Sequence, residues 1–219
     1  MSVTSEMIVQ SFLSSIDIGS HTASPYDHWI LRDCLPERAV DDILTLPFET
    51  PDLEGLSGKR ELHNKSRTYC DAANRERFPV VDALAEAFQD DQVTGRIADQ
   101  FKTDLSGTYL RIEFAQDTDG FWLEPHSDLG VKLFTMLLYV SRDESHTDLG
   151  TDIYDAERNH VGRSPFVANA AMIFVPSSIT FHGFESRPIE GIRKSVIINY
   201  VSDEWRAREQ LAFPDAPIA

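Results

Sequence analysis

The period of the hydrophobic pattern changes at about Gly107, and this change limits the folds open to the chain. Before it, apolar residues recur at the 3.6-residue spacing of amphipathic helices. After it, β-branched and aromatic residues dominate and the period falls to two, which is typical of β-strands. Helices followed by strands indicate an α+β layout, with the helices packed on one face of the sheet.

The elements expected on each side of this change are short. One strand at 26–31 and three helices, at 33–46, 78–88 and 93–101, are predicted before it. Turns rich in Gly, Pro, Asp and Ser separate the strands predicted after it. These strands are 109–114, 121–128, 132–140, 151–154, 166–167, 171–175, 179–184 and 192–201. Short strands at this spacing indicate a sandwich or a barrel.

The length of 219 residues fits one domain with a sizeable core. We expect a polar, irregular lead-in at 1–24, a domain at 25–205 and a tail at 206–219. Within the domain, 25–106 is predicted to be the helical part and 107–203 the strand-rich core.

Composition excludes several classes of function. The formal net charge of −16 repels phosphate backbones, so nucleic acid is not an expected partner. The sequence has no apolar run long enough for a membrane span and no basic, apolar start of the secretory kind. Cys34 and Cys70 lie far apart, which favours reduced thiols and a cytoplasmic protein.

The stretch 121–130, FWLEPHSDLG, contains a pair of side chains suited to binding a metal. On a strand, residues two apart point to the same face, so His126 and Asp128 project together and Ser127 points away. An imidazole nitrogen and a carboxylate oxygen provide two of the three ligands of a facial metal site.

His182 is the candidate for the third ligand. Five of the seven histidines lie in polar or turn-rich segments: His21, His28, His63, His146 and His160. His182 instead lies in a short apolar segment, ITFHGF. It is either a buried histidine satisfied by a backbone carbonyl or a metal ligand.

Arg193 and Ser195 share one face of the predicted strand at 192–201 and are expected to point inward. A buried guanidinium needs an anion, because an unpaired buried charge is very costly. That anion is either an internal Asp or Glu or the carboxylate of a ligand. Arg193 would present a planar fork to such a ligand, and Ser195 a hydroxyl donor.

In this order, His126-x-Asp128, His182 and Arg193-x-Ser195 resemble the 2-oxoglutarate/Fe(II)-dependent oxygenases, in particular the prolyl-4-hydroxylase-like branch. The resemblance implies a double-stranded β-helix (jelly roll) core with N-terminal helices packed on one face. It implies Fe(II) held by His126, Asp128 and His182, and 2-oxoglutarate held by Arg193 and Ser195. It also implies O2 as co-substrate and ascorbate as a stimulant.

The reaction implied by the resemblance is hydroxylation of an unactivated C–H bond, with release of succinate and CO2. Related halogenases carry Gly or Ala where this chain has Asp128, so hydroxylation, or a related desaturation or epimerisation, is favoured. The acidic surface and small size favour a small-molecule substrate, such as an amino acid or sugar derivative. The candidate substrate contacts are Trp122, Glu124, Asn199, His63, Arg67 and Tyr69.

Two other functions stay open. One is a cupin-like metal-binding module without oxygenase activity, which would not need an inward Arg193 and Ser195. The other is a peptidyl hydroxylase that acts on a protein, which would need an open groove beside His126.

Overall fold

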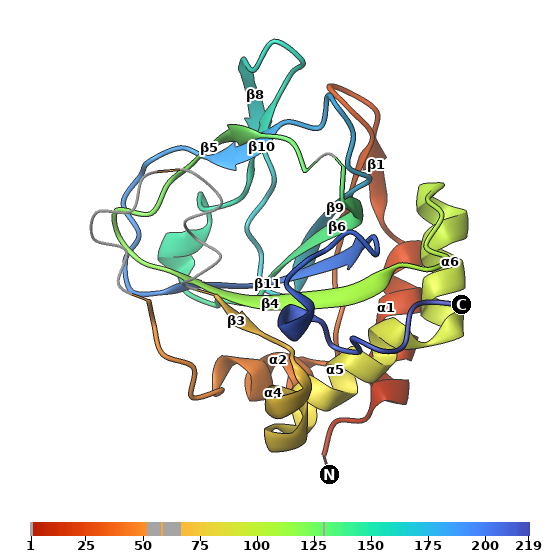
Figure 1. Cartoon of the computed structure of the whole chain (residues 1–219). Coiled ribbons are helices and arrows are strands. Elements are labelled where there is room, and N and C mark those ends of the chain that lie inside the picture. Colours follow the sequence, from red (N-terminus) through yellow and green to blue (C-terminus); the bar gives the residue numbers. More distant parts are fainter. Residues whose placement is uncertain (1, 52–57, 59–66, 129) are drawn as a thin grey trace.

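The computed structural model describes residues 2–51, 58, 67–128 and 130–219, which form a mixed α+β chain (Figure 1). The α-helices are α1 (Ser5–Asp17), α2 (Glu37–Leu44), α4 (Ala72–Arg77), α5 (Pro79–Gln89) and α6 (Asp91–Phe101), and short 3-10 helices cover Glu144–His146 and Arg208–Gln210. None of the helices within these ranges has the length and apolar character needed to cross a membrane.

The strands build two sheets in which neighbouring strands are antiparallel. The strands are β1 (Ser20–Thr22), β2 (His28–Leu31), β3 (Thr68–Tyr69), β4 (Tyr109–Asp117), β5 (Leu123–His126), β6 (Lys132–Tyr139), β7 (Asp152–Tyr154), β8 (His160–Arg163), β9 (Ala170–Phe174), β10 (His182–Phe184) and β11 (Arg193–Val201). The larger sheet has the order β1-β2-β9-β6-β11-β4-β3, and the smaller sheet the order β5-β10-β7-β8.

The helices cover the face of the larger sheet that points away from the smaller sheet (Figure 1). Strand alternation on β11 shows how the chain builds this layer. Val196, Ile198 and Tyr200 are fully buried in the main apolar core, and the Tyr200 hydroxyl donates to the Phe88 carbonyl of α5 at 2.5 Å. The alternate residues, Arg193 among them, face the smaller sheet. The helical core therefore fixes which face of the large sheet carries polar groups.

The expectation that the lead-in at 1–24 is irregular is wrong, because Ser5–Asp17 forms the helix α1. Ile8, Phe12 and Ile16 recur every four residues and are buried, so the helix presents an apolar stripe to the core. The rings of Phe12 and Phe88 lie 4.8 Å apart. The final residues also pack, since Ile218 is buried and its N–H donates to the Thr108 carbonyl at 2.8 Å. The domain boundaries themselves stay a prediction.

The other predicted elements mostly match those observed. The three predicted helices correspond to α2, α5 and α6, and seven of the eight C-terminal strands overlap observed ones. The strand predicted at 166–167 is wrong, and β8 was missed because its HVGR sequence is short and largely polar. In addition, β5 ends at His126, so Asp128 lies just beyond the strand that was expected to contain it.

Candidate metal centre and its pocket

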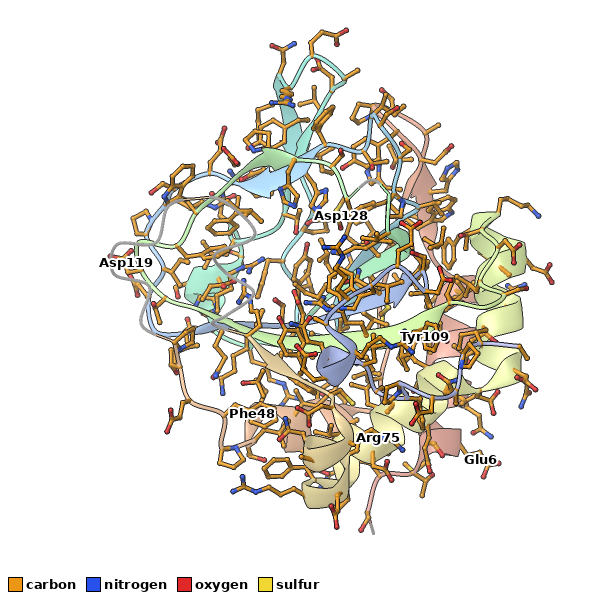
Figure 2. All side chains as sticks on the ribbon, in the orientation of Figure 1. Glu6, Phe48, Arg75, Tyr109, Asp119 and Asp128 are labelled. Carbon is orange, nitrogen blue, oxygen red and sulfur yellow. The ribbon has the colours of Figure 1, made fainter. Side chains whose placement is uncertain are left out.

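His126, Asp128 and His182 converge between the two sheets, and Figure 2 shows Asp128 there. One ligand atom from each residue lies within 4.8 Å of the other two. Nε2 of His126 is 3.9 Å from Oδ1 of Asp128, and Nε2 of His182 is 3.9 Å from Oδ2 of the same carboxylate. The structure therefore brings the predicted triad together.

Backbone carbonyls fix the tautomer of both histidines. Nδ1 of His126 lies 2.9 Å from the Glu124 carbonyl, and Nδ1 of His182 lies 3.1 Å from the Thr180 carbonyl. A carbonyl only accepts, so each Nδ1 carries a proton, and in the neutral imidazole it is then Nε2 that has the lone pair. Metal-binding histidines are commonly oriented in this way. The contact of His182 with a backbone carbonyl is therefore confirmed, and its role as a metal ligand stays a prediction that this contact does not oppose.

The carboxylate of Asp128 is buried and oriented by its neighbours. Its Oδ2 accepts from Nζ of Lys132 at 2.9 Å and from Oγ1 of Thr135 at 3.2 Å. These donors stabilise the ionised form that a metal needs. Two imidazole nitrogens and one carboxylate oxygen form a donor set that fits Fe(II) and leaves room for further ligands.

The triad lines a pocket whose lining also includes Arg193 and Ser195. Arg193 is buried and does have an internal anion: its Nη1 lies 2.5 Å from Oδ2 of Asp117 on β4. Its Nε donates to the Leu149 carbonyl at 2.8 Å. The internal ion pair that the sequence left open is therefore present, and any ligand anion must share Arg193 with Asp117.

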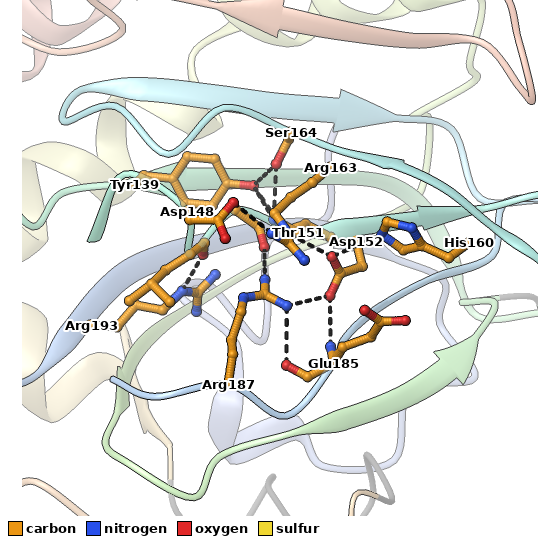
Figure 3. Close-up of polar contacts among 12 residues, drawn as sticks. Tyr139, Asp148, Thr151, Asp152, His160, Arg163, Ser164, Glu185, Arg187 and Arg193 are labelled. Carbon is orange, nitrogen blue, oxygen red and sulfur yellow. Dashed lines mark hydrogen bonds and ion pairs between the residues drawn. The ribbon is translucent and has the colours of Figure 1, made fainter. Parts of the chain in front are cut away.

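Ser195 faces the pocket directly opposite Tyr139 of β6. The Tyr139 hydroxyl lies 2.8 Å from Oγ1 of Thr151 and 2.6 Å from Oγ of Ser164 (Figure 3). These contacts join the inner face of the larger sheet to the segments beside β7 and β8. They fix the wall of the pocket next to Arg193.

No protein-family model and no curated protein matches the sequence, whereas solved structures match its fold. A prolyl 4-hydroxylase from Phytophthora capsici aligns with 94% of this chain and 68% of its own, at 14% identity and a TM-score of 0.61. The chain has the prolyl 4-hydroxylase fold. A prolyl hydroxylase from Trichoplax adhaerens, in complex with a hypoxia inducible factor peptide fragment, aligns over 93% and 91% at 15% identity and a TM-score of 0.59. HygX from Streptomyces hygroscopicus, with nickel and 2-oxoglutarate bound, aligns over 93% and 88% at 14% identity and a TM-score of 0.51.

Within this prolyl 4-hydroxylase fold, the predicted substrate contacts have different positions. Arg67 lines the pocket. Trp122 is 39% exposed, and its ring lies against Gly58 rather than in the pocket lining. Asn199 is fully buried behind the lining, where its amide donates to Oγ1 of Thr135 at 3.0 Å. Glu124 is exposed, and Tyr69 is half-buried with a hydroxyl that accepts from Arg111. His63 lies outside the described residues.

The sequence alone did not point to six charged or polar residues of the lining: Glu113, Asp117, Lys132, Thr135, Tyr139 and Thr151. Tyr139 lies inside a predicted strand, and strand alternation could have placed it on the inner face. Asp117 lies beyond the predicted end of its strand, at 114, so the pattern offered no signal for it.

A second cluster of possible metal ligands, Asp152, His160 and Glu185, is better described as an ion-pair hub (Figure 3). Asp152 accepts from Nε of Arg163 and from Nη1 of Arg187, each at 2.6 Å, and from the Glu185 N–H at 2.6 Å. Burial raises the pKa of Asp152, but these bonds from Arg187, Glu185 and Arg163 outweigh it, so the pKa lies below its ordinary value. Two guanidiniums at one carboxylate would repel a cation.

Proposed function

We propose that this protein is an Fe(II)- and 2-oxoglutarate-dependent dioxygenase that hydroxylates an unactivated C–H bond of a small molecule and releases succinate and CO2. The observation that carries the proposal is the convergence of the imidazoles of His126 and His182 and the Asp128 carboxylate on one pocket, which also contains Arg193. The two antiparallel sheets and the solved structures that share this fold support a double-stranded β-helix as its scaffold.

In this proposal, His126, Asp128 and His182 hold Fe(II) on one face and leave adjacent positions for 2-oxoglutarate and O2. Bound iron, with these two co-substrates, would supply the oxidation of the C–H bond. Arg193 binds the distal carboxylate of 2-oxoglutarate, and the Ser195 hydroxyl donates to the same group. That HygX has been solved with nickel and 2-oxoglutarate supports this choice of co-substrate.

Several residues prepare the site without touching the reacting bond. Lys132 and Thr135 hold the Asp128 carboxylate in place through Oδ2. The apolar side chains in the lining limit the access of water to the metal: Phe121, Leu123, Leu137, Phe184 and Ile197. A dry, oriented site protects an oxidising centre from side reactions.

A small polar substrate is favoured by the character of the pocket wall. Arg67, Glu113 and Lys132 line the same pocket as the triad, and the side chains of Arg67 and Lys132 are only 8% and 4% exposed. Each of these groups is paired within the protein, but together they make this part of the pocket wall polar, which suits an amino acid or a sugar derivative. A second candidate function, peptidyl hydroxylation, is favoured by the solved structures of the same fold, one of which holds a peptide fragment.

The first test is an anaerobic titration of the protein with Fe(II) and then 2-oxoglutarate. A weak visible charge-transfer band is expected when 2-oxoglutarate chelates an open Fe(II) site, and His182→Ala is expected to lack it. Tight binding of another metal without this band would contradict the proposal and support a cupin-like binding module.

The second test separates the two substrate classes. Succinate release is measured with free amino acids, with sugars and with proline-containing peptides. Stimulation by free small molecules is expected, and stimulation by peptides alone would replace the proposal with peptidyl hydroxylation.

A further inference from the structure

Arg193 shares its carboxylate partner with a second guanidinium. Asp117 accepts from Nη1 of Arg193 through Oδ2 at 2.5 Å and from Nη1 of Arg67 through Oδ1 at 2.7 Å. The side chains of Arg193, Arg67 and Asp117 are 7%, 8% and 1% exposed. All three line the pocket that holds the metal triad. The pocket wall therefore contains a buried cluster of two cations around one anion.

The next charged pair on β4 does not remove the excess positive charge. Arg111 and Glu113 lie 2.6 Å apart, with side chains 0% and 10% exposed, and form a neutral pair. Within the described part of the chain, these two groups together hold three guanidiniums (Arg67, Arg111, Arg193) and two carboxylates (Asp117, Glu113). A buried net charge is costly unless an anion accompanies it.

Without Arg67, Arg193 and Asp117 would form a neutral ion pair with no net attraction for an anion. An incoming carboxylate would then meet the negative Asp117 next to the guanidinium that it needs. Arg67 offsets Asp117, so the cluster as a whole attracts an anion. Burial lowers the pKa of Arg67, but the charges of Asp117 and Glu113 raise it by more than burial lowers it. The pKa therefore lies above its ordinary value, and Arg67 remains a cation.

We propose that Arg67 is a specificity-determining residue of the co-substrate site: by balancing Asp117, it lets Arg193 accept the distal carboxylate of a 2-oxo diacid. This inference rests on the proposed function and adds to it a residue far from Arg193 in sequence. Arginine has five N–H donors in a planar fork. The hydrogen bonds of Arg193 to Leu149 and Asp117 use Nε and Nη1, and Nη2 carries further donors that a ligand can use.

The test compares two ligands that differ only at the distal end. 2-Oxoglutarate ends in a carboxylate, and 2-oxopentanoate has the same chain length but ends in a methyl group. Binding of each to the Ni(II)-loaded protein is measured by titration calorimetry, which needs no turnover. We expect Arg67→Met to weaken 2-oxoglutarate binding by about 10- to 100-fold, the range of a charge-assisted hydrogen bond, and to leave 2-oxopentanoate binding unchanged.

Two further variants define the outcome. Arg142→Met is the matched control, because Arg142 is 44% exposed and pairs with Glu37 and Asp41 at the surface; it should leave both ligands unaffected. The double variant Arg67→Met/Asp117→Asn removes one charge of each sign and restores the excess of one cation. It should therefore regain most of the 2-oxoglutarate affinity lost in Arg67→Met, and it provides the measurement if the single variant does not fold.

The results separate this inference from the function on which it rests. If the wild-type protein binds neither ligand, the proposed function is wrong. If it binds 2-oxoglutarate and Arg67→Met keeps the full preference over 2-oxopentanoate, Arg67 has no part in specificity. Failure of the double variant to recover affinity would overturn the charge-balance argument.

Discussion

His126 and His182 lie directly opposite each other on β5 and β10, and their ring centroids are 4.3 Å apart. Each ring is held by a hydrogen bond from Nδ1 to a carbonyl two residues earlier in the chain. The distance between the two Nε2 atoms therefore depends on the register of one strand pair. This makes the register between β5 and β10 the feature that builds the candidate metal centre.

Replacing His182 should remove metal binding with little change in the rest of the fold. In His182→Ala, the carboxylate and one imidazole remain, which is too few ligands for a stable facial site. We expect the bound Fe(II) or Ni(II), measured by elemental analysis after dialysis, to fall at least about 10-fold. His21→Ala is the control, since His21 is an exposed histidine that pairs with Asp27 at the surface. Equal metal content in both variants would exclude His182 as a ligand.

Replacing Asp128 should abolish substrate-dependent succinate release. Asp128→Ala removes the predicted carboxylate ligand and also the anion that faces Lys132. Groups that merely orient metal ligands already contribute about 10- to 100-fold, so the loss should exceed about 100-fold. Asp148→Ala changes an exposed carboxylate, 81% accessible, and should retain activity. A fully active Asp128→Ala protein would refute the ligand assignment.

Strand alternation predicted the inner face of β11 correctly, because its pattern depends on local sequence alone. Arg193 and Ser195 point to the pocket, and Val196 points to the helices. The partner of Arg193 was not predictable in the same way. Asp117 lies opposite Arg193 because β4 pairs with β11 over its whole length, and the sequence does not encode that register in any local pattern.

The first helix shows a different limit. Ile8, Phe12 and Ile16 have helical spacing, but four of the six residues between them are Gln or Ser, so the segment looks like a lead-in. Only the packing of Phe12 against α5 reveals its contribution to the core. A short amphipathic helix gains most of its stability from tertiary contacts, so its sequence alone gives a weak signal.

Phe12→Ala should therefore destabilise the whole protein rather than a flexible terminus. Phe12 is fully buried, and a Phe-to-Ala change in a core typically costs about 3–5 kcal/mol. Chemical denaturation gives the free energy of unfolding. Met7→Ala is the matched control in the same helix, because Met7 is 44% exposed. If both variants unfold like the wild type, α1 does not contribute to the core.

Asp152→Asn should destabilise the protein at neutral pH, and the deficit should shrink in acid. The folded-state pKa of Asp152 is lowered, so its ionised form stabilises the fold above the ordinary carboxyl pKa, and this contribution is lost as the pH falls through the lowered value. Because Arg163 and Arg187 would lose a buried partner, we expect a cost of about 3–5 kcal/mol at neutral pH. Denaturation curves at several pH values measure it. Asp148→Asn, at the exposed end of the same network, should cost less than about 1 kcal/mol, and a pH-independent deficit in Asp152→Asn would contradict the assignment.

Gly183 sets how closely β10 approaches β5, and through it the spacing of the two histidines. A Cβ at Gly183 would lie 2.7 Å from the Leu123 carbonyl oxygen and 3.2 Å from that of Glu124. The second of these carbonyls orients His126. Gly183→Ala must therefore push the strands apart, at a cost of about 1–3 kcal/mol typical of overpacking, and displace His126 from His182.

The expected result for Gly183→Ala is a loss of metal affinity larger than its loss of stability would explain. Metal affinity is measured by competition with a chelator, and stability by denaturation of the metal-free protein. Gly162→Ala is the control in the same sheet, because a Cβ there would meet no atom within 4 Å. If Gly183→Ala lost stability but bound the metal as tightly as Gly162→Ala, the register of β5 and β10 would not control the centre.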